Sequence, residues 1–296
     1  MRVLLAGHRG QLGRTLLPLL TQQHRPATGE QPAHGPAHTV LGIDLPDHDI
    51  SDRAAMLKLA RTFRPDLILN AAAMTDVDGC ARDPELAYRV NGMGTQNLAL
   101  AAADVGAELM QISTNEVFDG RATAPYDEWA IRHPINPYGR SKLAGEWYTE
   151  RLLNRFYIVR TAWLYAAEGR NFPHRILELA DERGALQVVS DEVGNPTYVV
   201  DLAQAIVRLQ ETHAYGIYHL VNEGAASRFD FAAALLACSQ RDDVTLTPIS
   251  SDTFARASTP PAYAPLANTA AAALGIRLRP WREAVAAFID DAGYRR

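Results

Sequence analysis

The sequence has few cysteines, no long hydrophobic run and no excess of basic residues. Its two cysteines, Cys80 and Cys238, lie far apart without metal-ligand spacing, so we expect neither a disulfide framework nor a zinc site. No apolar run approaches the roughly 20 residues that cross a bilayer, and the apolar start is too short for a signal peptide. The formal charge of -5 argues against a nucleic-acid or anionic-membrane partner. We therefore expect a cytoplasmic protein.

The residues that are present are those of an ordinary globular protein. Apolar residues make up 47% of the chain and charged residues 21%. A length of 296 residues suffices for one large α/β domain, or for a domain with a smaller lobe. No internal repeat or low-complexity tail interrupts the chain.

The start of the chain combines a short apolar run, a glycine-rich turn and a helical pattern. Residues 3–6 are continuously apolar, as in a strand buried on both faces, and Gly7-His-Arg-Gly-Gln-Leu-Gly13 follows. Leucines then recur at helical spacing over residues 16–20. Glycines let a backbone approach a pyrophosphate, whose charge then lies at a helix N-terminus. A strand, a glycine turn and a helix in this order predict a dinucleotide site.

Two charged residues bear on which dinucleotide this is. The second expected strand, residues 39–43, ends at Asp44, where a carboxylate accepts hydrogen bonds from the adenosine ribose and favours NAD. Arg9, in the glycine turn, can instead meet a 2'-phosphate, which favours NADP. The cofactor preference stays open. The alanines at 71–73, after a third expected strand, permit close approach of a flat ligand, and tight core packing explains them equally well.

Prolines and glycines between the first helix and the second strand predict a surface loop over residues 24–38. The loop contains three histidines, His24, His34 and His38. Because no carboxylate or cysteine accompanies them at fixed spacing, we favour a plain loop over a metal site.

Further buried strands are expected at residues 66–70, 107–112 and 156–159, with helical patterns between them. This alternation predicts a Rossmann-type, doubly wound parallel sheet. Thr114 follows the fourth strand at the carboxyl edge, where ligands of such sheets lie. Its hydroxyl can hold a substrate carbonyl, or it can simply end a strand.

Tyr138 and Lys142 lie one turn apart on a helix that the prolines before Tyr138 allow to begin there. The apolar face of this helix is expected to contain Leu143, Trp147 and Leu152. A phenol has a pKa of about 10, and a neighbouring ammonium brings it into working range as an acid or base. A surface tyrosine near a solvated lysine is the alternative, which the upstream motifs disfavour.

The regular alternation weakens after the strand at 156–159. We therefore predict a dinucleotide-binding domain over residues 1–165. Residues 166–296 would form mainly a smaller, discontinuous substrate-binding lobe, with some segments returning to the first domain.

These features together resemble the extended short-chain dehydrogenase/reductases, and more closely the dTDP-4-dehydrorhamnose reductases, which complete dTDP-L-rhamnose biosynthesis. The similarity covers nearly the whole chain and rests on separate stretches in order. They are the Gly7 to Gly13 turn, Asn70-Ala-Ala-Ala-Met-Thr75 with Val77-Asp78, Ser113-Thr114 with Val117-Phe118, Tyr138-Gly-Arg-Ser-Lys-Leu-Ala-Gly-Glu146, Arg160-Thr-Ala-Trp163, Gly194-Asn-Pro-Thr197 with Asp201-Leu-Ala203, and Leu274-Gly275 with Trp281-Arg-Glu283.

The resemblance implies a reductase that transfers a hydride from NADH or NADPH to the 4-keto group of a nucleotide-linked 6-deoxysugar, with dTDP-4-dehydro-L-rhamnose the best candidate. It also implies a homodimer and assigns residues to roles. The catalytic residues would be Thr114, Tyr138 and Lys142. The cofactor would be bound by Gly7, Arg9, Gly10, Gln11, Leu12, Gly13, Asp44, Leu45, Asp49, Ile50, Ala71, Ala72, Ala73, Tyr138 and Lys142. The substrate would be bound by Thr75, Thr114, Asn115, Tyr138 and Trp163, and no metal is expected.

The chain departs from the family pattern at three positions. The family usually has Asp and Tyr where Asn115 and Glu116 stand, and Gln where Glu192 stands. Such changes alter selectivity more readily than they remove chemistry. They also keep open a different class of function, a silent nucleotide-binding subunit similar to the regulatory subunit of methionine adenosyltransferase.

Overall fold

The computed structural model describes residues 1–21, 38–253 and 256–296. The loop expected at 24–38, with His24 and His34, therefore lies outside the described residues except for His38. Within the described ranges, no three histidine, cysteine, aspartate or glutamate side chains are grouped as metal ligands. None of the helices in this part of the chain has the length and apolarity to cross a membrane.

The chain divides into two compact units, each made of several segments. The first unit contains Met1–Ser113, Pro137–Val159 and Ile206–Ile217, and the second contains Thr114–Asn136, Arg160–Ala205 and Tyr218–Arg296. Residues 114–136 and 160–165, which we had placed with the dinucleotide domain, are thus grouped with the second unit. The assignment of cofactor to one unit and substrate to the other stays a prediction.

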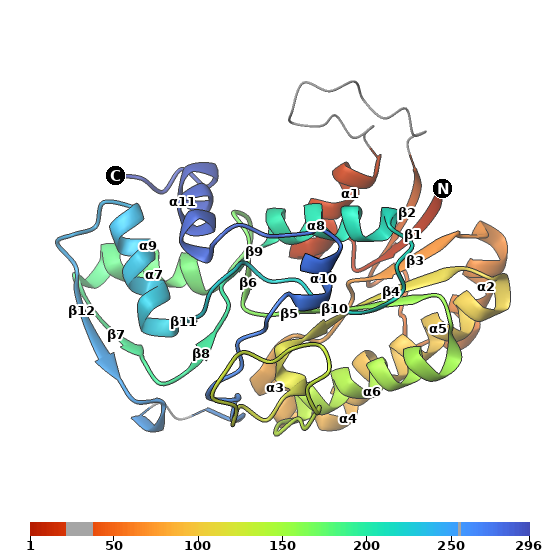
Figure 1. Ribbon diagram of the computed structural model, residues 1–296, viewed down its shortest axis with the longest axis horizontal. Helices are drawn as coiled ribbons and strands as arrows, with labels where there is room; N and C mark the ends of the chain where they lie inside the picture. Colours follow the sequence, from red (N-terminus) through yellow and green to blue (C-terminus); the bar gives the residue numbers. More distant parts are fainter. Residues whose placement is uncertain (22–37, 254–255) are drawn as a thin grey trace. The chain divides into compact units, whose positions relative to one another are not determined.

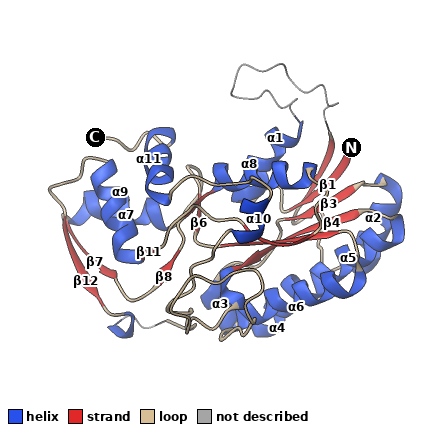
Figure 2. Ribbon diagram, in the orientation of Figure 1, coloured by secondary structure: helices blue, strands red, loops and turns tan. Residues whose placement is uncertain are grey.

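A six-stranded sheet, red in Figure 2, forms the centre of the first unit. Its order is β10-β5-β4-β3-β1-β2, and β1 pairs in parallel with both β2 and β3, while β3 pairs in parallel with β4. The order reverses between β1 and β3, which opens a crevice at their carboxyl ends. The α/β prediction with a parallel sheet is confirmed. The strands are β1 Arg2–Ala6, β2 Thr39–Ile43, β3 Leu67–Asn70, β4 Glu108–Thr114, β5 Phe156–Thr161 and β10 Gly216–His219.

Helices cover both faces of this sheet because its central strands are apolar on both sides. Figure 1 shows α5 and α6 on one face and α1 on the other. Leu4, Ile68 and Leu109 of the sheet pack with Met56 and Leu98 of the covering helices, and all five are almost fully buried. The helices of this unit are α1 Gln11–Thr21, α2 Arg53–Phe63, α3 Val77–Arg82, α4 Pro84–Ala87, the π-helix Tyr88–Met93, α5 Gly94–Val105, α6 Pro137–Leu152 and the end of α8 Val199–Glu211.

The expected buried face of one helix needed correction. Helix α6 begins at Pro137, one residue before the predicted start, and Trp147 is 44% exposed and does not belong to the buried face. The buried residues of this helix include Leu143, as predicted, but most of the others are small or polar. At Gly145, for example, a Cβ would lie 2.9 Å from the Asn91 carbonyl oxygen, so only glycine fits there. Helix α2 is capped by Asp52, whose carboxylate accepts from the Ala55 amide.

The second unit is built around an aromatic core. Tyr165, Tyr198, Phe231 and Phe288 are almost fully buried, and the Tyr165 and Phe231 ring centroids lie 5.2 Å apart. The described part of this unit also contains three two-stranded sheets, four further α-helices and the start of α8. They are β6 Leu164–Tyr165 with β9 Thr197–Tyr198, β7 Ala185–Val189 with β12 Thr245–Ile249, β8 Val193–Gly194 with β11 Ala226–Ser227, and α7 Phe172–Arg183, α9 Arg228–Cys238, α10 Thr269–Ala273 and α11 Trp281–Asp291.

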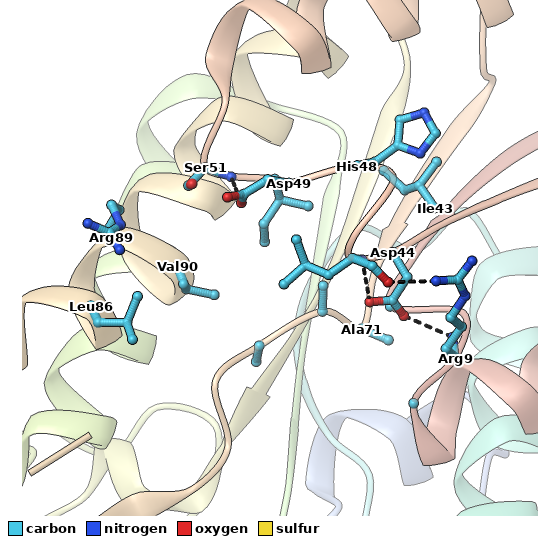
Figure 3. A pocket seen from close by; sticks show the side chains of 16 residues that line it. Arg9, Ile43, Asp44, His48, Asp49, Ser51, Ala71, Leu86, Arg89 and Val90 are labelled. Carbon is cyan, nitrogen blue, oxygen red and sulfur yellow. Dashed lines mark hydrogen bonds between the residues drawn. The ribbon is translucent and has the colours of Figure 1, made fainter. Parts of the chain in front are cut away.

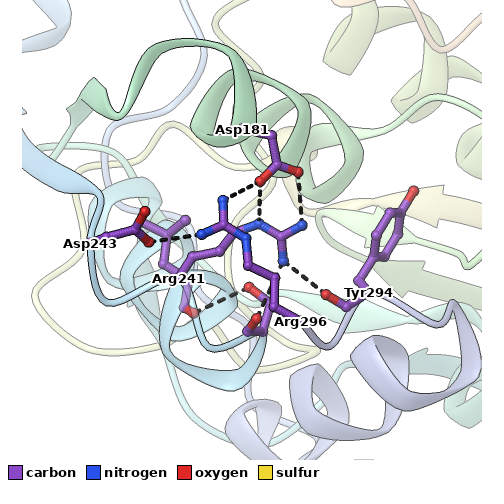
Figure 4. Close-up of polar contacts among 7 residues, drawn as sticks. Asp181, Arg241, Asp243, Tyr294 and Arg296 are labelled. Atoms are coloured by element: carbon purple, nitrogen blue, oxygen red, sulfur yellow. Dashed lines mark hydrogen bonds and ion pairs between the residues drawn. The ribbon is translucent and has the colours of Figure 1, made fainter.

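An ion-pair cluster connects the last residues of the chain to α7. Arg241 donates to both carboxylate oxygens of Asp181, at 3.0 and 2.8 Å, and to the Tyr294 carbonyl oxygen at 2.8 Å. Arg296 pairs with Asp181 and with Asp243 (Figure 4). The cluster holds the C-terminal segment beside the helices of its own unit.

Candidate functional site

The glycine turn at the end of β1 is shaped by close backbone contacts. Gly7 has a φ of +80°, and a Cβ there would lie 2.6 Å from the Ala72 nitrogen. A Cβ on Gly13 would lie 2.1 Å from the Gly7 carbonyl oxygen, whereas one on Gly10 would lie 3.3 Å from it. Only glycine fits at 7 and 13, so the first turn of α1 packs directly against the strand that precedes it.

A cavity of about 440 Å³ opens beside this turn, at the carboxyl ends of β1, β2 and β3. It lies at the switch point of the sheet, where dinucleotides bind in folds of this type. Most of the predicted cofactor residues line it: Gly7, Arg9, Gly10, Asp44, Leu45, Asp49, Ile50, Ala71, Ala72 and Ala73. Gln11, Leu12 and Gly13 do not line the cavity, because they form the start of α1 behind it.

The residues predicted to meet the adenosine end of a cofactor are already organised by hydrogen bonds. The Asp44 carboxylate accepts from the backbone amides of Arg9 and Leu45, each at 2.9 Å. The Arg9 guanidinium donates to the Leu45 carbonyl at 2.6 Å and to the Asp47 carboxylate at 2.7 Å, as Figure 3 shows for the first of these contacts. Asp44 and Arg9 therefore occupy one corner of the cavity, and each retains capacity for a further hydrogen bond.

Several residues that sequence reasoning did not assign also line this cavity. No motif in the sequence marked them as cavity residues. The further lining residues are Ile43, His48, Ser51, Leu86, Arg89 and Val90 (Figure 3).

Lys142 is fixed in the interior of the first unit. Its side chain is 4% exposed, and its ammonium donates to the Ile112 carbonyl oxygen at 2.7 Å. Burial lowers the pKa of Lys142 to about 8, while the negative charge of Glu146 acts in the opposite direction. Tyr138 lies one turn earlier on α6, as the spacing predicts.

A polar chain that the sequence did not reveal supports the start of α6. Asn91, in the π-helix, donates to the Ser141 hydroxyl at 2.9 Å, and Ser141 donates to the Tyr138 carbonyl at 2.7 Å. Asn91 also exchanges hydrogen bonds with the Met74 backbone, at 2.8 and 3.0 Å. The segment before Thr75 and the first turn of α6 are thereby held by one buried amide. Thr75 itself is exposed.

The second unit begins with Thr114, the last residue of β4, and Asn115, which follows it. Both are buried, at 6% and 4% exposure. The Thr114 hydroxyl donates to the Asn115 side-chain oxygen at 3.3 Å and accepts from the Glu116 amide at 3.2 Å. The Asn115 amide nitrogen donates to the Ala264 carbonyl oxygen at 3.1 Å, a bond that the family's usual aspartate cannot make when ionised. Asn115 thus has a structural contact of its own.

Trp163 is held in a strained position in the second unit. Its φ is 42°, an uncommon value for a bulky residue. A Cβ on Gly194 would lie 2.6 Å from the indole, and the Arg228 guanidinium carbon lies 3.6 Å from a ring centroid. Glycine in the Gly194-Asn-Pro-Thr197 turn therefore makes room for the indole, and a cation–π contact orients it.

The two acidic departures from the family pattern belong to one charged cluster around Arg228. Glu192 lies 3.6 Å from Arg228 and 3.5 Å from Arg256, and Glu116 accepts from the Asn136 amide at 2.6 Å. Burial raises the pKa of Glu116 and lowers that of Arg228 to about 10, and opposite charges in the cluster counter both shifts. The new carboxylates thus face arginines in the same unit.

Comparison with known proteins supports the family resemblance along nearly the whole chain. The family model described as the RmlD substrate binding domain matches residues 1–293. The dTDP-4-dehydrorhamnose reductase of Mycobacterium tuberculosis is 37% identical, covering 96% of this chain and 91% of that protein.

Solved structures agree with this match. A dTDP-4-dehydrorhamnose reductase from Clostridium acetobutylicum is 36% identical with a TM-score of 0.90, covering 99% of this chain and 100% of that one. The corresponding enzyme of Bacillus anthracis, solved with NADP, is 34% identical with a TM-score of 0.89 over 98% and 99% of the two chains. The chain belongs to the dTDP-4-dehydrorhamnose reductase family, the family described by the RmlD substrate binding domain.

Proposed function

We propose that the chain is an NAD(P)H-dependent reductase of the 4-keto group of a dTDP-linked 6-deoxysugar, with dTDP-4-dehydro-L-rhamnose as substrate and dTDP-L-rhamnose as product. The observation that carries the proposal is the buried Lys142 one helical turn from Tyr138, in the unit whose glycine turn opens on a cavity of about 440 Å³. Relatives named for this activity match over almost the full length.

The residues present fit a dinucleotide. Gly7 and Gly10 would let the pyrophosphate approach the start of α1, and Asp44 and Arg9 would meet the adenosine end. The small side chains at 71–73 would leave space for its middle. When bound, the nicotinamide supplies the hydride.

The chain's own residues would then manage the proton and the orientation of the ketone. Tyr138 would donate its proton to the alkoxide oxygen that develops on the reduced carbon, and the positive charge of Lys142 would make that phenol a stronger acid. Thr114 would hydrogen-bond the ketone oxygen, and Trp163, Asn115 and Thr75 would contact the sugar nucleotide. The division into a dinucleotide unit and a substrate unit belongs to the same proposal.

The silent regulatory subunit is not favoured, because the full-length relatives are named as reductases and Thr114, Tyr138 and Lys142 are all present. The homodimer, the cytoplasmic location and the lack of a nucleic-acid partner stay predictions from the sequence.

The proposal is tested by mixing the purified protein with NADH or NADPH and with dTDP-4-dehydro-L-rhamnose, which an epimerase generates in the same reaction. The measurement is the decrease in absorbance as the reduced nicotinamide is oxidised. We expect turnover with at least one cofactor. A Tyr138→Phe variant should still bind the cofactor and lose turnover by about 10²–10⁴-fold. No turnover on this or any related keto sugar, with cofactor binding intact, would contradict the proposal.

A further inference from the structure

A second buried charge lies on α6, one turn after Lys142. Glu146 is fully buried, with 0% exposure, and stands four residues after Lys142, so the two side chains emerge on the same side of the helix. The Ser113 hydroxyl donates to the Glu146 carboxylate at 2.5 Å. A carboxylate without access to water is costly unless it serves a partner of opposite charge.

The strand β4 holds both charged side chains from adjacent residues. Ile112 accepts from the Lys142 ammonium at 2.7 Å, and the next residue, Ser113, donates to Glu146. Two consecutive residues of β4 therefore fix the ammonium and the carboxylate separately, one through its backbone carbonyl and the other through its hydroxyl. This arrangement keeps the negative charge at a set place beside the lysine instead of leaving it to a flexible side chain.

Among the titratable groups near Lys142, Glu146 is the main source of negative charge. On α3, the buried Cys80 thiol also acts on Lys142, but its Sγ lies 3.6 Å from the Met74 carbonyl oxygen and a neutral thiol carries no charge. The β4 residues that touch the pair contribute only a carbonyl and a hydroxyl. The remaining titratable or charged side chains on α6 and on the helices packed against it are all at least partly exposed. On the neighbouring helices they are Asp78 and Arg82 of α3, Glu85 of α4, Tyr88 and Arg89 of the π-helix and Asp104 of α5. On α6 they are Tyr138, Arg140, Tyr148, Glu150 and Arg151.

We propose that Glu146 is a positioning residue for the reductase, which keeps the Lys142 side chain charged and in place one turn from Tyr138. The family comparison assigns it no role, and it acts through Lys142 without touching the substrate. Burial alone would favour the neutral amine, which cannot strengthen Tyr138 as an acid. The carboxylate of Glu146, fixed by Ser113, offsets that cost.

Lysine titration can be observed directly, because the chain contains two lysines, Lys58 and Lys142. Protein labelled with ¹³C at the lysine ε-carbon should give two signals, which a Lys58→Arg variant assigns. Lys58 is exposed on α2 and provides an internal reference. The measurement uses the full chain without substrate. The inference takes the role of Lys142 from the proposed function, but this titration reports on Glu146 even if the substrate proposal fails.

Glu146→Gln is the decisive variant. Glutamine has nearly the same shape and can still accept from the Ser113 hydroxyl, so the change removes the charge and retains the anchor. We expect the midpoint of the Lys142 titration to fall by about one pH unit or more relative to the parent protein. Glu150→Gln, which removes a charge one turn further along the same helix, is the matched control and should leave that midpoint unchanged.

Activity gives the second readout. If the proposed function holds, the pH at which turnover begins to fall should move down in Glu146→Gln by the same amount as the Lys142 midpoint. Glu146→Asp retains the negative charge, so its Lys142 midpoint should lie close to that of the parent protein. Should Glu146→Gln fold poorly, Ser113→Ala, which loosens the carboxylate, should give a smaller shift in the same direction. A Lys142 midpoint that is the same in the parent, Glu146→Gln and Ser113→Ala would overturn the proposal.

Discussion

The Lys142 ammonium donates a 2.7 Å hydrogen bond to the Ile112 carbonyl oxygen while burial lowers the pKa of that ammonium to about 8. Lys142 is therefore charged below pH 8 and loses its proton above it. Because the neutral amine no longer strengthens Tyr138 as an acid, we expect turnover to fall above about pH 8. The measurement is kcat between pH 6 and 10 with saturating cofactor and substrate.

A Lys142→Arg variant provides the control for this profile. Arginine stays charged throughout the range, so the decline above pH 8 should disappear even if the larger side chain lowers the overall rate. A parent profile that stays flat to pH 10 would show that the charge of Lys142 does not limit turnover.

The contact between Gly13 and Gly7 predicts a large effect of a single methyl group. A Cβ at Gly13 would lie 2.1 Å from the Gly7 carbonyl oxygen, which is a backbone atom and cannot move aside as a flexible side chain would. Gly13→Ala should push α1 away from the turn and weaken NADPH binding by about tenfold or more. Fluorescence titration with NADPH measures this effect.

Gly10→Ala is the natural comparison, since its Cβ would lie 3.3 Å from the same oxygen. A shift of a few tenths of an ångström relieves that contact, so the loss in affinity should be smaller than for Gly13→Ala. Equal losses in the two variants would mean that the turn adjusts as a whole.

The parts of the fold that the sequence predicted well depend on local patterns. The apolar run before Gly7, the glycine spacing and the interval between Tyr138 and Lys142 each carry their geometry within a few residues. The edge position of Thr114 could also be predicted, because all strand ends of a parallel sheet point the same way.

The features that were missed depend on contacts between distant segments. Trp147 is exposed, and the buried residues of α6 are largely small and polar, including a glycine at 145 whose Cβ would lie 2.9 Å from the Asn91 carbonyl oxygen. Asn91 itself contacts Met74 and Ser141, which no spacing rule connects. Likewise, nothing around residue 228 indicates that its guanidinium stacks on Trp163.

The position of the Arg9 side chain leads to a prediction about how the protein distinguishes NADPH from NADH. Its guanidinium already pairs with Asp47 at 2.7 Å, in a contact exposed to solvent. A 2'-phosphate would compete for Arg9, whereas the ribose hydroxyls of NADH would use Asp44. Arg9→Ala should therefore raise the KM for NADPH by about tenfold and change the KM for NADH little. Steady-state kinetics with both cofactors measures the difference.

Asp47→Ala is the converse change, since it releases Arg9 from its ion pair. The KM for NADPH should then fall relative to the parent. If Arg9→Ala affected NADH and NADPH equally, Arg9 would have no part in choosing between them.

The contact of Asn115 with Ala264 predicts the cost of restoring the family's usual residue. Asn115→Asp would turn a carboxylate oxygen toward the Ala264 carbonyl in a nearly water-free site. We expect a loss of about 2–3 kcal/mol in the free energy of unfolding at pH 7. Because the site would raise the pKa of the new carboxyl, the loss should shrink as the pH falls and the group protonates. Urea unfolding at pH 7 and pH 5 measures both values.

Asn115→Ala serves as the reference, because it removes the bond without adding a charge. The loss in unfolding free energy caused by Asn115→Ala should not depend on pH between 5 and 7. An Asn115→Asp variant as stable as the parent at pH 7 would mean that the Ala264 carbonyl does not need this donor.

The Arg241 side chain predicts the stability of the C-terminal segment. It is 6% exposed and binds Asp181 through two nitrogens and the Tyr294 carbonyl through a third (Figure 4). Arg241→Met should lower the free energy of unfolding by about 1–3 kcal/mol, since Tyr294 loses a donor in a mostly buried place. Arg296→Met removes only a half-exposed partner of Asp181 and should cost less.

The pH dependence separates the ion pair from packing. Hydrogen bonds from Arg241 and Arg296 hold the pKa of Asp181 well below its ordinary value of 3.8, so the pair stabilises the fold above that pH. As the pH falls below 3.8 toward the folded-state value, this contribution is lost. The difference in unfolding free energy between parent and Arg241→Met should therefore decrease in acid, whereas a difference due to packing alone would persist. Urea unfolding from pH 7 to pH 3 distinguishes the two, because only the charge contribution titrates.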